Sequence, residues 1–108
     1  ELPYYAEVNG KKHLVVPYSQ TLNDGKFIRP QGYGGPTDFV DSLKRTLDYM
    51  WDEGETHPKI MSIGLHPRII GQPSRISALR EFLEYALEKD KVWIARRLDI
   101  ANHWLANY

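Results

Sequence analysis

The chain has 108 residues, and its 14 Lys and Arg residues balance its 14 Asp and Glu residues. This length corresponds to at most one domain, and the balanced charge argues against a protein that binds nucleic acid through a basic surface. The absence of cysteine excludes disulfides and thiolate metal sites. No apolar run reaches the length of a membrane span, and the first residues do not have the pattern of a signal peptide. We therefore expect a cytoplasmic protein without membrane or nucleic-acid partners.

The first third of the chain predicts a strand followed by a long loop. Asn9-Gly10 is a strong turn signal. Residues 12–18 contain three consecutive apolar residues, as in a strand covered on both faces. Residues 19–36 form a long segment with four glycines and two prolines, and loops of this length are usually functional. Its expected apolar anchors are Phe27, Ile28 and Tyr33.

The remaining residues predict helices that alternate with strands. A helix is expected to start at Pro36-Thr37-Asp38 and to stop at Gly54. The apolar run 59–65 predicts a buried strand, and Ser74 is a plausible N-cap for a second helix. The residues expected to line one face of this helix are Ile76, Leu79, Leu83 and Leu87, with Phe82 and Ala86 adjoining. A short strand over 92–95 and a closing helix over 96–108 complete the pattern.

This order predicts an α/β fold in which the strands pair in parallel. Strands that alternate with helices are joined by right-handed crossovers. Three parallel strands are too few to close a barrel, and the sequence contains no internal repeat. An open strand edge invites pairing with other chains, so we expect a homo-oligomer or a chain bound to a partner.

His66 and Arg68 are the best candidates for chemistry. They follow the predicted strand 59–65, and functional groups in α/β folds gather at the carboxyl ends of strands. In the functional interpretation, His66 is a general acid or base and Arg68 holds an anionic or carbonyl group. The alternative is a histidine bound to backbone beside an arginine in a surface ion pair.

Asn23-Asp24 and Arg96-Arg97 follow the other two predicted strands and would lie on the same side of the sheet. Asp24 could orient an imidazole or hold substrate, although Asn-Asp-Gly also favours turns for local reasons. Arg97 could clamp a carboxylate or a polarised carbonyl. The structural alternative for the arginine pair is an ion pair with Asp99 at the start of a helix.

The other three histidines, His13, His57 and His103, do not have the spacing of a metal motif. We therefore expect no metal site within this chain.

Several motifs in combination resemble the polysaccharide deacetylase (NodB-homology) superfamily. They are Met61-Ser-Ile-Gly-Leu-His66-Pro-Arg68, Ile70-Gly71-Gln-Pro73, and Val92 to Ala101 followed by His103-Trp104. Leu14-Val-Val-Pro-Tyr18 and Asn23-Asp24 fit the same branch, that of PuuE-type allantoinases and cyclic imidases. The resemblance covers almost the whole chain and identifies residues 1–108 with the C-terminal part of such a domain.

This resemblance implies a segment of an incomplete, distorted (β/α) barrel that hydrolyses non-peptide C–N bonds in amides. It implies that His66 is the catalytic general acid and that Arg68, Asn23, Asp24 and Arg97 belong to the substrate pocket. The deacetylases of this family hold a divalent metal through motifs of the N-terminal half, which this sequence lacks, and at least some members of the allantoinase branch need no metal. The implied partners are that missing half or a second chain and a small amide substrate. We expect the isolated chain to be inactive.

The substrate alternatives are allantoin, a cyclic imide and an N-acetyl sugar, the last of which would make the chain part of a polysaccharide deacetylase. A further alternative is a non-catalytic remnant of the fold that serves in oligomer assembly.

Overall fold

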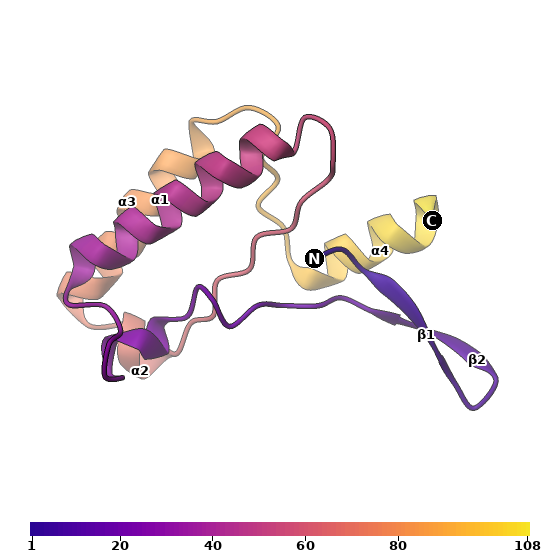
Figure 1. Cartoon of the computed structure of the whole chain (residues 1–108), viewed down its shortest axis with the longest axis horizontal. Coiled ribbons are helices and arrows are strands. Elements are labelled where there is room, and N and C mark those ends of the chain that lie inside the picture. The colour runs from indigo at the N-terminus through magenta and orange to yellow at the C-terminus, as the bar shows by residue number, and fades with distance from the viewer.

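The structure, a computed structural model, describes all residues 1–108 and consists mainly of helices with one β-hairpin (Figure 1). In chain order the elements are β1 (Tyr4–Val8), β2 (Lys11–Val15), the 3₁₀ helix η1 (Asp24–Phe27), α1 (Pro36–Glu53), α2 (Pro67–Ile70), α3 (Pro73–Leu87) and α4 (Arg97–Asn107). No helix combines the length and the apolar character that a membrane span requires.

Helix α1 has the boundaries that its sequence predicts. Pro36 occupies the first turn, where its missing N–H costs nothing. Asp38 accepts a hydrogen bond from the Gly34 N–H at 2.8 Å, next to the positive end of the helix dipole. The helix ends before Gly54, and its fully buried side chains, Phe39 and Leu43, lie on one face.

Helix α3 packs side by side with α1 and completes the main core (Figure 1). It contributes Ala78, Phe82 and Ala86 to the cluster of buried side chains. The predicted face is correct in part: Phe82 and Ala86 are buried and Leu79 packs against the core, whereas Ile76, Leu83 and Leu87 are exposed. The two alanines let α3 approach α1 closely, so small residues face the neighbouring helix. The helix also begins at Pro73 with Gln72 as its N-cap, not at Ser74.

The long segment before α1 is ordered, as expected. The rings of Phe27, Tyr33 and Phe39 form a cluster with centroids 5.3–5.4 Å apart. Ile28, by contrast, is 61% exposed and does not anchor the loop. The aromatic cluster attaches η1 to the start of α1.

The hairpin confirms the turn at Asn9-Gly10. Both residues have positive φ, 50° and 73°, as the tight turns of hairpins require. The turn joins β1 and β2 as an antiparallel pair in which Tyr4 lies opposite Val15. The predicted strand is therefore present, but its partner is the segment that precedes it.

The prediction of parallel β-α units is wrong for this chain. The structure contains one isolated parallel bridge, between Asn23 and Gly64, and no parallel sheet. Residues 59–63 and 92–95 form no strand. A strand needs the backbone groups of a neighbour to complete its ladder. Residues 59–65 have such a neighbour in this chain only at Gly64, which is bridged to Asn23, and residues 92–95 have none.

The chain is also more open than a compact domain. Its radius of gyration is 15.7 Å, against about 13 Å for a compact domain of 100 residues. Only 13 of 108 residues are buried. An apolar hollow of about 510 Å³ lies among α1, α3, α4 and residues 58–63 and 91–95. Most of the apolar surface of α4 and of the unpaired segments therefore has no cover within this chain.

Candidate functional site

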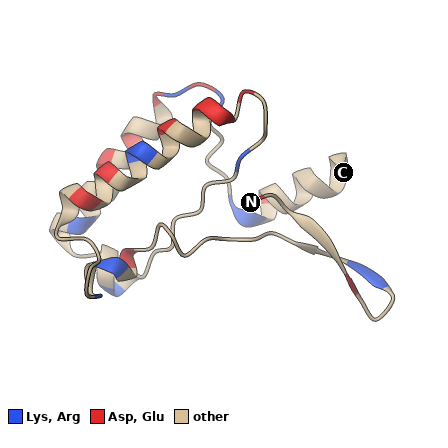
Figure 2. Ribbon diagram, viewed as in Figure 1, with Lys and Arg blue, Asp and Glu red and all other residues tan.

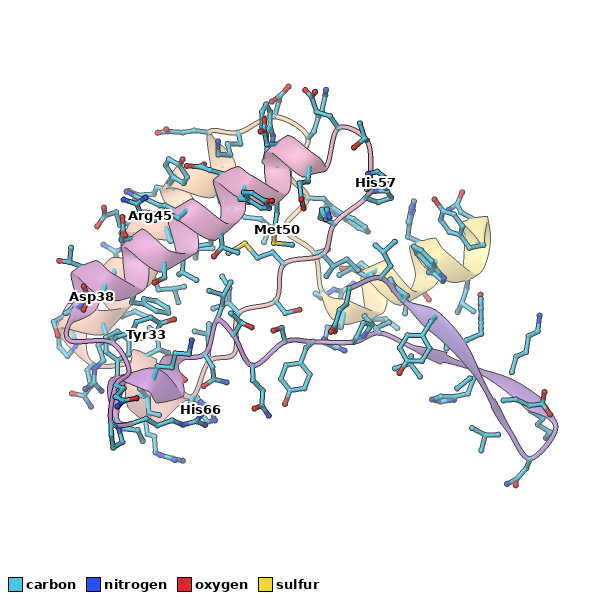
Figure 3. All side chains as sticks on the ribbon, viewed as in Figure 1. Tyr33, Asp38, Arg45, Met50, His57 and His66 are labelled. Carbon is cyan, nitrogen blue, oxygen red and sulfur yellow. The ribbon has the colours of Figure 1, made fainter.

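The candidate site lies where η1 meets the start of α2, and its centre is a contact between Asp24 and His66. These two residues are 42 positions apart in the sequence. The single parallel bridge brings them together, because Asp24 N–H donates to the Gly64 carbonyl at 2.9 Å and Gly64 N–H donates to the Leu22 carbonyl at 2.7 Å. Figure 3 shows His66 at this end of the molecule, away from Met50 and His57.

Asp24 is fully buried, with an exposed fraction of 0%. A buried carboxylate is costly unless hydrogen bonds stabilise it. Both of its oxygens are bound by one residue: Oδ2 accepts the His66 backbone N–H at 2.7 Å, and Oδ1 lies 2.6 Å from His66 Nδ1. This paired contact fixes both the backbone and the ring of His66.

The contact leaves one ring nitrogen of His66 available. A carboxylate only accepts hydrogen bonds, so Nδ1 carries the hydrogen that points to Asp24. Nε2 has no hydrogen-bond partner in the chain, and 46% of the side chain is exposed. The exposed nitrogen can therefore exchange a proton with a bound molecule while Asp24 holds the ring in place.

Local sequence explains the position of His66. Pro67 disfavours the helical conformation in the preceding residue, and His66 is extended, with φ −119° and ψ 123°. Pro67 also begins the single-turn helix α2, whose Ile69 and Ile70 are buried. The imidazole is thus held at the junction between an extended segment and a helix that is fixed by its own apolar side chains.

Asn23 has a local role beside this contact. Its side-chain Oδ1 accepts the Gly25 N–H at 2.8 Å, which is the turn chemistry that its sequence favours. Asn23 caps η1, while the adjacent Asp24 holds His66. Both interpretations of the Asn-Asp pair therefore describe a contact in the structure, each for a different residue.

The arginines that the sequence singles out lie in different surroundings. Arg68 is exposed in α2, two residues after His66. Arg97 donates to the backbone carbonyls of Val16 and Pro17 and lies 5.9 Å from the Tyr18 ring centroid. Arg97 thus ties α4 to the end of β2 and does not contact the Asp24–His66 pair. Arg96 pairs with Asp99 at 2.8 Å, as the structural alternative predicts.

Gly64 is a positioning residue that the sequence interpretation did not single out. A Cβ atom at Gly64 would lie 2.4 Å from Asn23 Nδ2, so a side chain there would push the two segments apart. The available signal was a glycine within an apolar strand-like run, which often marks close approach of another backbone.

Tyr33 packs against Phe27, the last residue of η1, with ring centroids 5.3 Å apart. Its hydroxyl is buried without a hydrogen-bond partner, and burial raises the pKa of this group.

We find no group of three or more acidic or histidine side chains that could hold a metal ion.

The apolar hollow among α1, α3 and α4 is not part of this site. Its lining residues include Met50, Trp51, Ile60, Phe82, Trp93 and Trp104, and neither Asp24 nor His66 is among them.

Comparison with known proteins shows that the chain is similar to part of several longer proteins. No family model matches the sequence. A protein of Schizosaccharomyces pombe that carries polysaccharide deacetylase in its name is 38% identical over 96 residues, which span 88% of this chain and 30% of that protein. The crystal structure of a probable polysaccharide deacetylase from Pseudomonas aeruginosa PAO1 matches with a TM-score of 0.93 and 47% identity. It is matched over 99% of this chain and 36% of its own length. The chain is thus a segment of the polysaccharide deacetylase fold, about one third of the length of the proteins that it matches.

The crystal structure of PuuE allantoinase is similar to the same degree. It matches with a TM-score of 0.94 and 47% identity, over 99% of this chain and 36% of that one. The resemblance found in the sequence motifs is therefore confirmed at the level of the fold that these proteins share. The match to about one third of these structures also explains the absence of a parallel sheet, because the chain contains only part of the fold.

Proposed function

We propose that this chain is the part of a C–N hydrolase that carries the general acid, His66. The Asp24–His66 contact carries this proposal, because a buried carboxylate at 2.6 Å holds Nδ1 and leaves Nε2 exposed. The proteins with similar structures are named as a polysaccharide deacetylase and an allantoinase, both of which cleave C–N bonds. A proton donor for a leaving nitrogen fits that chemistry.

In the proposed reaction, water adds to the carbonyl carbon of an amide and forms a tetrahedral intermediate. The C–N bond then breaks, and its electron pair goes to nitrogen, which is a poor leaving group until it is protonated. The protonated ring of His66 gives the Nε2 proton to this nitrogen and becomes neutral. The hydrogen on Nδ1 stays with Asp24 throughout, so the ring keeps its tautomer and orientation.

The group that activates water lies, in this proposal, outside these 108 residues. The segment spans 36% of the solved structures that it matches, which leaves most of the fold outside these residues. Any divalent metal would be held by the rest of the protein. The active unit is therefore the assembled protein, in which residues 1–108 form one part of a polysaccharide deacetylase-like domain.

For the substrate, we propose a small non-peptide amide of the allantoin or cyclic-imide type. The similarity to PuuE allantoinase supports this choice. The equal similarity to a probable polysaccharide deacetylase keeps an N-acetyl sugar as the second candidate.

An assembly role is the second candidate function, and the exposed apolar residues favour it. Trp93, Ile94, Leu98 and Leu105 are all more than half exposed. In this proposal, they are covered by the remainder of the fold or by another copy of the chain. A homo-oligomer of the isolated segment would support a purely structural role.

The test of the catalytic proposal is the substitution His66→Gln in the full-length protein. We expect amide hydrolysis to fall by roughly 10²–10⁴-fold, because general acid catalysis is lost. The matched control is His57→Gln, since His57 is exposed and lies far from His66 (Figure 3). Hydrolysis of allantoin, succinimide and an N-acetylglucosamine oligomer is measured for each variant. Unchanged hydrolysis by His66→Gln would refute the general-acid role.

A further inference from the structure

The distribution of charge around His66 points to a second feature of the site. The chain has no net charge, and most of its acidic residues lie on α1, α3 and the turns that follow them (Figure 2). Three cations lie in or just after η1 and in α2, namely Lys26, Arg29 and Arg68. Five Lys or Arg residues form ion pairs with carboxylates, namely Lys44, Arg45, Lys59, Lys89 and Arg96. Arg29 and Arg68 are not among them.

The guanidinium of Arg29 lies close to Gly25, the residue that follows Asp24. A Cβ atom built on Gly25 would be 3.6 Å from Arg29 Nη2 and 3.8 Å from its Nε. Gly25 follows Asp24 in η1, so the guanidinium covers the residue next to the buried carboxylate. Arg29 is exposed, and its guanidinium forms no hydrogen bond or ion pair in the chain.

Arg68 belongs to α2, the element that packs against η1, and lies two residues after His66. Its side chain is exposed and unpaired. The Asp24 carboxylate is fully buried and occupied by His66. The next carboxylate along the chain, Asp38, binds the Gly34 N–H. Neither carboxylate is paired with the two guanidinium groups.

We propose that Arg29 and Arg68 form a carboxylate-binding subsite beside His66, which holds the carboxylate produced by C–N hydrolysis. This inference rests on the proposed function. Water and an amide give one carboxylate and one amine, and in a cyclic amide both remain in the same product molecule. A guanidinium group binds a carboxylate through two parallel N–H···O bonds. The subsite would therefore bind the ring-opened acid more tightly than the neutral substrate.

The experiment measures binding of two matched probes to the full-length protein by calorimetry. The probes are N-carbamoylglycine, which is the ring-opened acid of hydantoin, and its neutral amide. We expect the acid to bind at least about tenfold more tightly than the amide. Arg29→Gln and Arg68→Gln should each remove most of this preference, because each variant loses a guanidinium that binds the carboxylate.

Two further variants make the result specific. Arg80→Gln is the matched control, because Arg80 is exposed and unpaired on α3, outside η1 and α2. Arg29→Lys keeps the charge but loses the planar fork, so the preference should be intermediate. Circular dichroism of each variant confirms that the fold is retained.

The outcomes separate the subsite from the proposed catalysis. If His66→Gln loses hydrolysis but keeps the preference for the acid, both proposals stand. If the wild-type protein hydrolyses no amide but shows the arginine-dependent preference, the catalytic proposal fails and the carboxylate subsite stands. Equal binding of the two probes, or an equal loss in Arg80→Gln, overturns the subsite.

Discussion

Two regions of this chain differ in what their side chains contact. The helices α1 and α3 bury a continuous set of apolar residues between them, including Phe39, Leu43 and Phe82. The hairpin, α4 and the extended residues 92–95 bury almost none, and α4 has no buried residue at all. Sequence patterns alone do not reveal this difference, because both regions are rich in apolar and aromatic residues. Stability in the isolated chain should therefore come from the α1–α3 pair.

The largest expected effect separates the two regions directly. Phe39→Ala removes a fully buried ring and should lower the free energy of unfolding by about 3–5 kcal/mol. Leu98→Ala, in α4, removes a side chain that is 61% exposed and should change it by less than about 0.5 kcal/mol. Chemical denaturation of the 108-residue chain measures both. A loss of several kcal/mol for Leu98→Ala would show that α4 is packed against another surface.

The regions also differ in how far the sequence could predict them. The boundaries of α1 follow from local signals, Pro36 and Asp38 at one end and Gly54 at the other, and the structure agrees. The segments 59–65 and 92–95 carry equally clear strand patterns, but a strand exists only with a partner. That partner is absent for most of their length, so a prediction from composition and periodicity was wrong here.

The candidate site could be predicted only in part, because some of its contacts follow from local sequence and others depend on packing. His66 and Asp24 were each placed at the end of an extended segment, and one parallel bridge suffices to bring them together. The buried state of Asp24 and the position of Arg29 depend on how η1 packs, and no local pattern encodes that packing. The predicted face of α3 was centred on Leu83 and Leu87, but the buried face is centred on Ala78, Phe82 and Ala86, because alanines carry little signal in a hydrophobic pattern.

The second prediction tests the contact that joins η1 to the extended segment. Asp24→Ala leaves the His66 N–H and ring without their partner and should lower the free energy of unfolding by about 1–3 kcal/mol. The control is Asp41→Ala, because Asp41 forms an exposed ion pair with Arg45 at 2.8 Å, and such pairs contribute about 1 kcal/mol or less. NMR signals of the His66 ring should show loss of the fixed tautomer only in the first variant. Equal stability of the two variants would indicate that the Asp24–His66 contact is not maintained in solution.

The third prediction concerns the backbone approach at Gly64. Gly64→Ala places a Cβ 2.4 Å from Asn23 Nδ2, and the resulting overpacking should cost about 1–3 kcal/mol. Gly35→Ala is the control, since a Cβ there meets nothing within 4 Å. In the double variant with Asn23→Ala, much of the loss at Gly64 should be recovered. Without this recovery, the strain must arise from the backbone and not from the side chain of Asn23.

The smallest effect should come from the polar network on the outer surface of the α1–α3 pair. The Tyr85 hydroxyl donates to Asp48, whose carboxylate also pairs with Lys89 at 3.0 Å. The hydrogen bond from Tyr85 and then the contact with Lys89 hold the pKa of Asp48 below its usual value. A carboxyl group with a lowered pKa in the folded state stabilises the protein above its unfolded pKa, and this contribution is lost as the pH falls through the folded value. Asp48→Asn should therefore lower the stability of the folded chain slightly at pH 7 and leave it unchanged near pH 2. The control is Asp52→Asn, because Asp52 is exposed and forms no ion pair. Thermal unfolding at both pH values measures the difference. A constant difference between the two would assign the effect of Asp48 to packing and not to its charge, and the ion pair between Lys44 and Glu81 would then be the remaining charged contact between α1 and α3.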